Sequence, residues 1–430
     1  MHSKKKGFKV GVSKKAIHIP DGFFPYRSFR GRYFTGLHDD IYVRCLFMES
    51  EEDRALLLSM ELGDLGEIDI WQNKISRMSG VPEDHIFLTV THNHAAPHVS
   101  DDYNQDVVDR EKTEEFGTWV WKVTEEAVRE AVNRVRPARM GFDTGSCDIN
   151  VNRNYIRDGR SIMAPNPHGI SDKTVAVMKF EDLDGGPIAY LLNYAVHGVV
   201  MFDSKLKDGG MLVSGDLPGE TCRIIEKRND EKVVALFTSG AAGDQIPRYM
   251  SHRTVHDGKG GMSRIDAREA GWVLLQVQAE NLADEVLRVA ETMDLFPFEM
   301  VLKAAQKKYR VPGQKKTENP MNVPKDYRFE DDEPVSMPLG VLMLGPVVLV
   351  CVPGEPVCSI GLDMKKALPL RHVIVISHCN GSLSYISDDS GYEHLAFEAV
   401  VSHFKRGCGR QAIIDGANEM VHLLTGEKRG

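Results

Sequence analysis

Short, continuous runs of apolar residues recur along the chain, and this feature constrains the fold more than any other. A strand with one face in water alternates apolar and polar residues. These runs are apolar almost throughout, which is typical of sheets covered on both faces. Strands are therefore predicted at residues 9–13, 41–48, 55–61, 86–91, 174–180, 188–196, 233–238, 341–344, 347–352 and 372–377.

Amphipathic segments lie between these runs and carry apolar residues at helical spacing. They predict helices at residues 69–78, 112–134, 217–227, 264–292, 357–366 and 392–404. Two polar stretches, 145–172 and 313–334, are expected to be long loops. This mixture predicts an α/β (α+β) fold in which layered mixed β-sheets carry flanking helices. We expect a single domain over residues 1–430.

Composition and charge limit the classes of function. The chain has 430 residues, 42% of them hydrophobic, and a formal net charge of −9, which indicates a globular protein and disfavours a nucleic-acid partner. The N-terminus has no apolar segment of the kind found in secretion signals, and the longest apolar run, 341–352, is interrupted by Gly345 and Pro346. The seven cysteines include no Cys-X-X-Cys pattern. We expect a cytoplasmic protein without a membrane span; the sequence leaves open whether it forms a homo-oligomer.

Two histidines at i, i+2 follow the apolar run 86–91. Side chains alternate faces along a strand, so His92 and His94 are expected on the same side of its end. Neutral imidazole is the commonest protein ligand of divalent transition metals, and the pair could begin a metal site. A loop pair bonded to the backbone would give the same pattern, so these two residues alone do not decide.

Other strand-like runs also end in residues that can carry chemistry. His197 follows the run 188–196, and alone it is explained more simply as a buried histidine bonded to a carbonyl. Glu355 follows the run 347–352, and a carboxylate in apolar surroundings needs a cation or hydrogen-bond donors. Open sheets place their sites at the carboxyl ends of strands. We therefore expect one site that gathers His92, His94, His197, Asp244, Glu355, Asn380 and Tyr385.

Several short motifs occur in an order known from one family. Thr-His-Asn-His-Ala-Ala-Pro at 91–97 is similar to Thr-His-Thr-His-Ser-Gly-Pro of the neutral (non-lysosomal) ceramidases. The chain resembles their catalytic domain from Gly11 to Glu398. The further matching segments are Asn152-Arg153, Tyr-Ala-Val-His-Gly at 194–198, Ser-Gly-Asp-Leu-Pro-Gly at 214–219, Ala-Gly-Asp-Gln-Ile-Pro at 242–247, Val-Pro-Gly-Glu at 352–355, and Asn-Gly-Ser-Leu-Ser-Tyr at 380–385 with Tyr392 and Glu398 after it.

The resemblance implies a ligand set and a chemistry. It implies one Zn²⁺ held by the residues that match the family's ligands, with substrate bound next to it. Two imidazoles, a carboxylate and a phenolate leave a position open, as catalytic zinc sites do. Water activated by the metal could then attack an amide or ester carbonyl. The implied metal ligands are His92, His197, Glu355 and Tyr385, and the implied pocket residues are His94 and Arg153.

The remaining roles follow from this chemistry. Arg153 or His94 could stabilise the developing oxyanion. Asp244 is expected either to act as a general base or to orient a ligand histidine; we favour the second, because a ligating imidazole needs its other nitrogen bonded. The expected catalytic residues are thus His94, Arg153 and Asp244, and the expected substrate-binding residues are His94, Arg153, Asn152, Gln245 and Tyr392.

Two departures from the family affect the expected substrate. Ile246 stands where the ceramidases have a serine implicated in catalysis, and isoleucine can neither attack a carbonyl nor donate a hydrogen bond. The residues after Glu398 are too few for the family's C-terminal immunoglobulin-like domain, so we expect that domain to be absent. Together with the polar stretch that carries Arg153, Arg157 and Arg160, these departures predict a small polar amide or ester as the small-molecule substrate.

Three other interpretations remain. A metal-dependent lyase or isomerase could use the same ligands, because a polarised carbonyl also acidifies the neighbouring proton. A binding protein with a structural metal would explain the missing serine. A barrel of the amidohydrolase type also places His-X-His after a strand, but the hairpin expected from 41–48 and 55–61 disfavours it. Manganese or iron would suit the mixed nitrogen and oxygen ligands as well.

Overall fold

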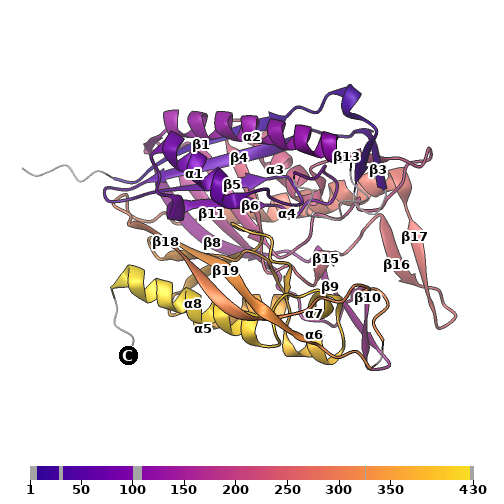
Figure 1. Cartoon of the computed structure of the whole chain (residues 1–430). Coiled ribbons are helices and arrows are strands. Elements are labelled where there is room, and N and C mark those ends of the chain that lie inside the picture. Colours follow the sequence, from indigo (N-terminus) through magenta and orange to yellow (C-terminus); the bar gives the residue numbers. More distant parts are fainter. Residues whose placement is uncertain (1–6, 29–31, 100–108, 325, 427–430) are drawn as a thin grey trace, which may run out of the picture.

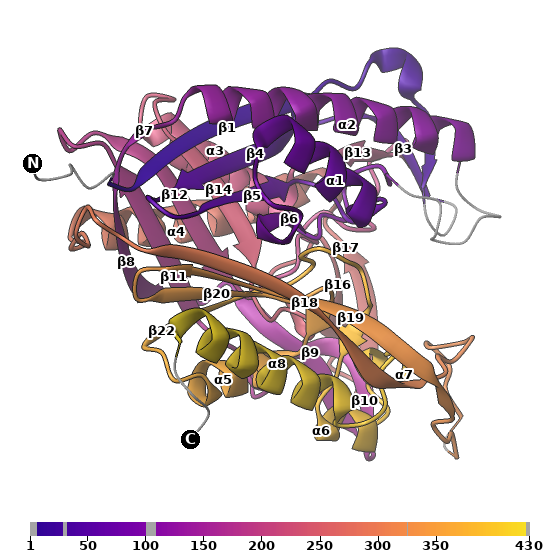
Figure 2. The same ribbon diagram turned by 60° about the vertical axis from the view of Figure 1, so that its left-hand side comes forward.

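Three sheets surround a common apolar core, and helices cover the outer face of each sheet (Figures 1 and 2). The computed structural model describes residues 7–28, 32–99, 109–324 and 326–426. The first sheet consists, in spatial order, of β6 (Ile86–Val90), β5 (Arg54–Met60), β4 (Ile41–Glu49), β1 (Lys9–Ile17) and β7 (Arg136–Pro137). Its outer face packs against α1 (Ile68–Ser79) and α2 (Arg110–Asn133).

The second and third sheets are built in the same way. The second sheet has the order β14 (Val234–Ser239), β12 (Pro187–Tyr194), β11 (Thr174–Glu181) and β8 (Arg139–Ser146), with α3 (Asp216–Arg228) and α4 (Gly271–Glu291) outside. The third has the order β18 (Leu302–Gln314), β19 (Asp331–Leu344), β20 (Val347–Cys351) and β22 (His372–Ile376), with α5 (Cys358–Ala367) and α8 (Cys408–Thr425) outside.

The three sheets share one connection pattern. In each, three antiparallel strands are followed by a helix, by a fourth strand that runs parallel to the third, and by a second helix on the outer face. The corresponding elements are β1, β4, β5, α1, β6 and α2 in the first unit, β8, β11, β12, α3, β14 and α4 in the second, and β18, β19, β20, α5, β22 and α8 in the third. The fold is therefore a threefold repetition of one arrangement.

Burial on both faces explains the continuous apolar strands. In β5, Leu56 and Leu58 pack towards α1 and α2, whereas Leu57 between them packs into the core that the three sheets share. Both faces of such a strand are removed from water, so an apolar residue is favoured at every position.

Smaller elements fill the ends of the sheets. They are β10 (Arg160–Asn166), β9 (Asn150–Arg157) and β15 (Gln245–Pro247) in one sheet, β13 (Met211–Val213), β3 (Arg32–Leu37) and β2 (Tyr26–Ser28) in another, the pairs β16 (His252–His256) with β17 (Met262–Asp266) and β21 (Glu355–Pro356) with β23 (Tyr385–Ile386), the helices α6 (Asp389–Glu393) and α7 (Phe397–Val400), and the 3-10 turns η1 (Asp21–Phe23), η3 (Glu83–His85) and η4 (Arg268–Ala270).

The layered α/β fold predicted from the sequence is confirmed, and the ten predicted strands all lie on observed strands. Two predicted helices and two predicted loops differ from the structure. The helix predicted at 264–292 begins at Gly271, after β17; the helix predicted at 392–404 is two short helices, α6 and α7. The loop predicted at 145–172 contains the hairpin of β9 and β10, and the stretch 313–334 belongs to β18 and β19 at its two ends.

The described residues contain no closed eight-stranded parallel barrel, because each main sheet is open and mostly antiparallel. The barrel alternative is thereby excluded for this part of the chain. Among the same residues, no helix combines the length and the apolar character that crossing a membrane would require.

Candidate metal centre

The parallel strands end at one place, and the histidines predicted from the sequence meet there. His92 follows β6, His197 follows β12, and Glu355 opens β21 shortly after β20. All three side chains are buried, and their ligand atoms lie within 4.8 Å of one another. The Nε2 atoms of His197 and His92 are 3.1 and 3.4 Å from Glu355 Oε2.

Hydrogen bonds to the backbone fix which nitrogen of each imidazole carries the proton. His197 Nδ1 is 2.9 Å from the carbonyl oxygen of Gln245, and His92 Nδ1 is 3.3 Å from that of Gly63. A carbonyl oxygen only accepts hydrogen bonds, so each Nδ1 is the donor and each Nε2 presents a lone pair. Burial lowers the pKa of His92 to about 4 and that of His197 to about 3, so both rings are neutral at pH 7.

These atoms fit a bound cation. Two lone pairs and a carboxylate oxygen converge without a proton between them, and among the described residues neither His197 Nε2 nor Glu355 Oε2 has a hydrogen-bond partner. Such an arrangement is costly in a buried site unless a positive charge is shared. Ligand atoms about 2.1 Å from one tetrahedral zinc lie about 3.4 Å apart, close to the separations seen here. The donor set therefore suits a divalent transition metal.

His94 lies beside His92, as predicted, although a strand does not place it there. His92 has a positive φ of 54° beyond the end of β6, so the alternation argument does not apply. The two rings are instead brought together by Asn93, whose side-chain amide donates to the carbonyl oxygens of Glu61 and Ser214. His94 Nε2 is 2.9 Å from His92 Nε2, and its ring packs edge-on against Phe202.

Arg153 and Tyr385 form the neighbouring wall. The Arg153 guanidinium lies over the Tyr385 ring and donates through Nε to Glu398 Oε1 at 2.7 Å. The Tyr385 hydroxyl interacts with both Arg153 and Glu355. Burial and the Glu355 charge raise the pKa of Tyr385 well above its usual value. Arg153 Nη2 is buried and has no partner among the described residues, so one strong donor remains available at the centre.

Asp244, Asn152 and Gln245 lie together in a neighbouring network. The Asp244 carboxylate accepts hydrogen bonds from the amides of Asn152 and Gln245 and from the backbone N–H of Cys358. Burial raises the pKa of Asp244 to about 6. The orienting role expected of Asp244 is filled differently, because the second nitrogen of His197 is bonded by the backbone carbonyl of Gln245. The three donors indicate that Asp244 joins β9, β15 and α5.

Tyr392 and Asn380 are placed away from the ligand atoms by their hydrogen bonds. The Tyr392 hydroxyl donates to the carbonyl of Phe404 at 2.5 Å, and its ring lies in a hollow of about 550 Å³ with Phe329. The Asn380 amide bonds the backbone of β6 through Leu88 N and Ile86 O, which ties the third unit to the first. The side-chain hydrogen bonds of Tyr392 and Asn380 thus go to the backbone and not to the imidazoles of the centre.

His378 also lies at the centre, although no motif in the sequence indicated it. It follows β22, is buried, and stacks on His92 with ring centroids 3.9 Å apart and an interplanar angle of 16°. The pattern that could have revealed it is the one used for His92, a histidine just after an apolar strand.

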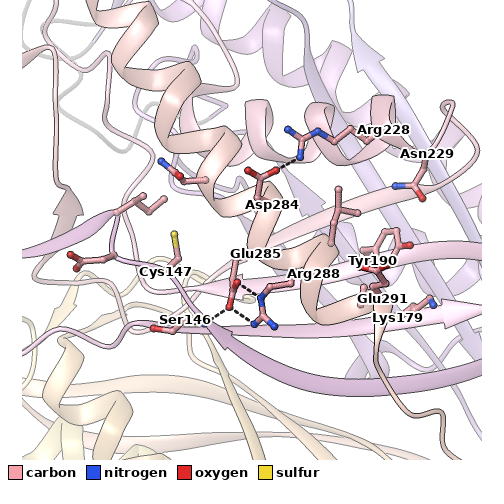
Figure 3. Close-up of a pocket in the computed structure, with 15 residues that line it drawn as sticks. Ser146, Cys147, Lys179, Tyr190, Arg228, Asn229, Asp284, Glu285, Arg288 and Glu291 are labelled. Carbon is pink, nitrogen blue, oxygen red and sulfur yellow. Dashed lines mark hydrogen bonds and ion pairs between the residues drawn. The ribbon is translucent and has the colours of Figure 1, made fainter.

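A larger hollow lies elsewhere, between the end of β8 and α4 (Figure 3). It has a volume of about 1070 Å³ and includes none of the predicted site residues. Its charges largely pair with each other, Arg228 with Asp284 and Arg288 with Glu285, whose carboxylate also accepts from the backbone N–H of Ser146 (Figure 3). We assign it no role.

Comparison with known proteins identifies the family. The sequence model described as "Neutral/alkaline non-lysosomal ceramidase, N-terminal" matches residues 22–265, more than half of the chain. The chain belongs to this family. The resemblance stated from the motifs is thereby confirmed.

Curated relatives and solved structures agree with this assignment. The neutral ceramidases of Drosophila pseudoobscura pseudoobscura and Drosophila melanogaster are each 24% identical, over 272 and 271 residues; both matches cover 56% of this chain. The matched region spans only 36% of the length of these relatives. The crystal structure of neutral ceramidase from Pseudomonas aeruginosa superposes with a TM-score of 0.75 at 16% identity, covering 98% of this chain and 75% of that one. A ceramidase complexed with C2 gives a TM-score of 0.74 at 15% identity, with 97% and 76% covered. These structures share the fold.

Proposed function

We propose that this protein is a zinc-dependent hydrolase that cleaves an amide bond. The observation that carries the proposal is the convergence of His92 Nε2, His197 Nε2 and Glu355 Oε2, while the neighbouring cation, Arg153, is ion-paired with Glu398, in a member of a family named for an amidase. A divalent ion supplies Lewis-acid polarisation of a carbonyl and makes a water molecule acidic enough to attack near neutral pH.

The chain's own residues supply the other parts of the reaction. Arg153 Nη2 is the free donor beside Glu355, so it would bind the amide oxygen and stabilise the negative charge that grows there. His94 lies next to the ligand His92, with the two Nε2 atoms 2.9 Å apart, and it would exchange a proton with water and the departing amine. Burial lowers its pKa well below the usual value, so the ring starts the reaction neutral. Glu398 and Tyr385 hold Arg153 in place.

We further propose that the substrate is an amide lipid of the ceramide class, in place of the small polar substrate expected from the sequence. The curated relatives are named neutral ceramidases. The expectation of a polar substrate rested on several arginines, but Arg157 and Arg160 donate to the backbone carbonyls of Gly260 and Val323. An apolar cluster of Val151, Val199, Ile246, Phe202 and Met250 reaches the centre through Phe202, whose ring packs edge-on against His94.

The test uses the full chain, freed of metal and reloaded with Zn²⁺. Ceramide in detergent micelles and a short, water-soluble N-acyl amino alcohol are each incubated with the protein in ¹⁸O-labelled water. Release of fatty acid carrying ¹⁸O from ceramide, absent in His197→Ala and retained in His372→Ala, is the expected result. Preferential cleavage of the soluble amide would instead support the small polar substrate expected from the sequence. Conversion without ¹⁸O would favour the lyase or isomerase, and metal binding without any turnover would favour the binding protein.

Ile246→Ser tests whether the missing family serine matters. Ile246 packs in the apolar cluster, and the proposed reaction uses water as the nucleophile. The substitution is therefore expected to leave turnover within about tenfold of the wild type. A gain of several orders of magnitude would show that the chain lost a serine-dependent step.

A further inference from the structure

The buried pair of Arg153 and Glu398 lacks half of the contact that an arginine can make with a carboxylate. A planar guanidinium can donate two parallel hydrogen bonds, through Nε and Nη2, to the two carboxylate oxygens. Arg288 bonds Glu285 in this way, with both distances 2.8 Å (Figure 3). Arg153 donates only through Nε, to Glu398 Oε1 at 2.7 Å, and its Nη2 has no partner among the described residues.

Asn154 explains the missing bond. Its Nδ2 donates to Glu398 Oε2 at 3.0 Å, so this oxygen faces Asn154 and not Arg153 Nη2. Glu398 is fully buried, and a buried carboxylate needs hydrogen-bond donors for both of its oxygens. Two successive residues of β9, Arg153 and Asn154, thus supply one donor each.

The β9–β10 hairpin holds Asn154 in one orientation. Asn154 Oδ1 accepts from Ser161 Oγ at 2.9 Å, and its backbone carbonyl accepts from Asn166 Nδ2 at 2.8 Å. Its backbone N–H donates to Asn152 Oδ1 at 2.8 Å. Because Oδ1 is engaged and a carboxylate only accepts hydrogen bonds, the amide nitrogen is the group that faces Glu398.

The unbonded Nη2 belongs to a guanidinium at the metal centre. Arg153 lies over the Tyr385 ring, with 5.3 Å between the guanidinium carbon and the ring centroid, and Tyr385 in turn interacts with Glu355. We propose that Asn154 is a positioning residue for amide hydrolysis, which holds Glu398 Oε2 away from Arg153 and keeps Nη2 free to bind the amide oxygen. This inference rests on the proposed function.

Removal of the Asn154 amide has a definite consequence on this proposal. Glu398 would turn and accept from both Nε and Nη2 of Arg153, as Glu285 does from Arg288. Nη2 would then be bound before substrate arrives, and the developing oxyanion would lose a donor.

The test uses the full chain with substitutions at Asn154. Asn154→Leu is close in volume and has no donor, and Asn154→Ala takes its place if the leucine variant does not fold. Asn418→Ala is the matched control, because Asn418 is also a half-buried asparagine whose amide makes one hydrogen bond, to the carbonyl of Ile414 on α8. With ceramide in detergent micelles and zinc-loaded protein, Asn154→Leu should lower kcat by about 100-fold and change KM by less than about threefold. Asn418→Ala should match the wild type.

Glu398→Gln shows whether Asn154 acts through Glu398. The glutamine amide has one acceptor oxygen, so Arg153 cannot make the two-bond contact with it whether or not Asn154 is present. In the Glu398→Gln background, Asn154→Leu is therefore expected to change kcat by less than about threefold. A loss as large as in the wild-type background would overturn the inference, because Asn154 would then act on the hairpin alone.

Crystal structures give a readout that does not depend on activity. Arg153 Nη2 should bond Glu398 in Asn154→Leu and remain unbonded to it in the wild type. A variant in which Nη2 still makes no bond to Glu398, or whose kcat equals that of the wild type, would overturn the inference and leave the hydrolase standing. Absence of amide turnover by the zinc-loaded wild type would overturn the proposed function, and the role of Asn154 with it.

Discussion

Two clusters of buried ionisable groups lie close together in the core and are balanced in different ways. In the arginine cluster, Arg44 lies between Glu61 and Glu226, and Lys14 also reaches Glu226 at 2.7 Å. In the histidine cluster, Glu355 faces His92 and His197, which are neutral. In the first cluster, cations of the chain contact both carboxylates, whereas in the second the neighbouring Arg153 pairs with Glu398 and, among the described residues, no arginine or lysine ion-pairs with Glu355.

The two clusters are joined through the chain between them. Asn93 bonds the backbone of Glu61, and the carbonyl of Gly63 bonds the His92 ring. The arginine cluster therefore anchors the segment that orients a ligand. A buried carboxylate is structural where a cationic side chain pairs with it, as in Glu61 and Glu226, and indicates a ligand where none does, as in Glu355.

Glu355→Gln is the strongest test of the difference between the two clusters. The amide loses the negative charge and can donate to an imidazole lone pair, so we expect zinc affinity to fall by more than about 100-fold. The metal-free variant should unfold at the same denaturant concentration as the metal-free wild type or a higher one, because burial disfavours the Glu355 charge and raises the pKa of this carboxyl. Metal content by plasma mass spectrometry and urea titration measure the two effects. A large loss of stability without metal would mean that Glu355 is neutralised within the chain.

The opposite response is expected in the arginine cluster. Arg44→Met leaves Glu61 and Glu226 buried without their main cation, and breaking such a pair costs about 3–5 kcal/mol. Urea denaturation of the metal-free protein measures this loss. The control is Lys315→Met at the exposed pair with Glu330, where no shift of the midpoint is expected. If Arg44→Met were as stable as the wild type, the cluster would not be structural.

Much of the fold was predictable because the strands are buried on both faces. Strands such as β5 and β20 are buried on both faces, and their sequences are therefore continuous apolar runs that can be recognised. The hairpin of β9 and β10 was missed because it is polar and partly exposed, so no apolar run marks it. The helix predicted at 264–292 began too early because its first residues form the short, largely exposed strand β17 and the turn η4, which precede α4.

The site was predictable only where a strand end and a motif coincided. His92, His197 and Glu355 satisfied both conditions, and the structure brings them together. Asp244 and Tyr392 satisfied the motif, but their hydrogen bonds serve the backbone and neighbouring amides. His378 satisfied the strand condition alone, because it follows the apolar strand β22 but belongs to none of the motifs.

A smaller perturbation tests the contact between the arginine cluster and the Ser-Gly-Asp-Leu-Pro-Gly segment, which ends at Gly219. A Cβ on Gly219 would lie 2.9 Å from Glu61 Cδ, so the Glu61 carboxylate would have to move. That movement would disturb its ion pair with Arg44 and its hydrogen bond from the backbone N–H of Tyr42. Gly219→Ala is therefore expected to destabilise the protein by about 1–3 kcal/mol. Gly66→Ala is the control, since nothing lies within 4 Å of its Cβ position. Equal stability of the two variants would show that Glu61 can move freely.

The finest test is the pH dependence of the arginine cluster. Burial raises the pKa of Glu61 to about 7, although Arg44 acts in the opposite direction. A carboxyl whose folded pKa lies above its unfolded value of about 4.5 stabilises the fold fully below that value and loses its contribution as pH rises through about 7. The stability of the wild type relative to Glu61→Gln should therefore fall by up to about 1.4 kcal/mol per pH unit between pH 5 and 7.

Glu49→Gln is the control. The pairs of Glu49 with Lys9 and Arg54 lower the pKa of Glu49 despite some burial, so its contribution is lost only at lower pH. The stability difference between the wild type and Glu49→Gln should therefore stay constant between pH 5 and 7. Urea titrations at half-unit intervals measure both slopes. A flat difference for Glu61→Gln as well would mean that Arg44 keeps Glu61 ionised, and the arginine cluster would then be neutralised by its cations over the whole range.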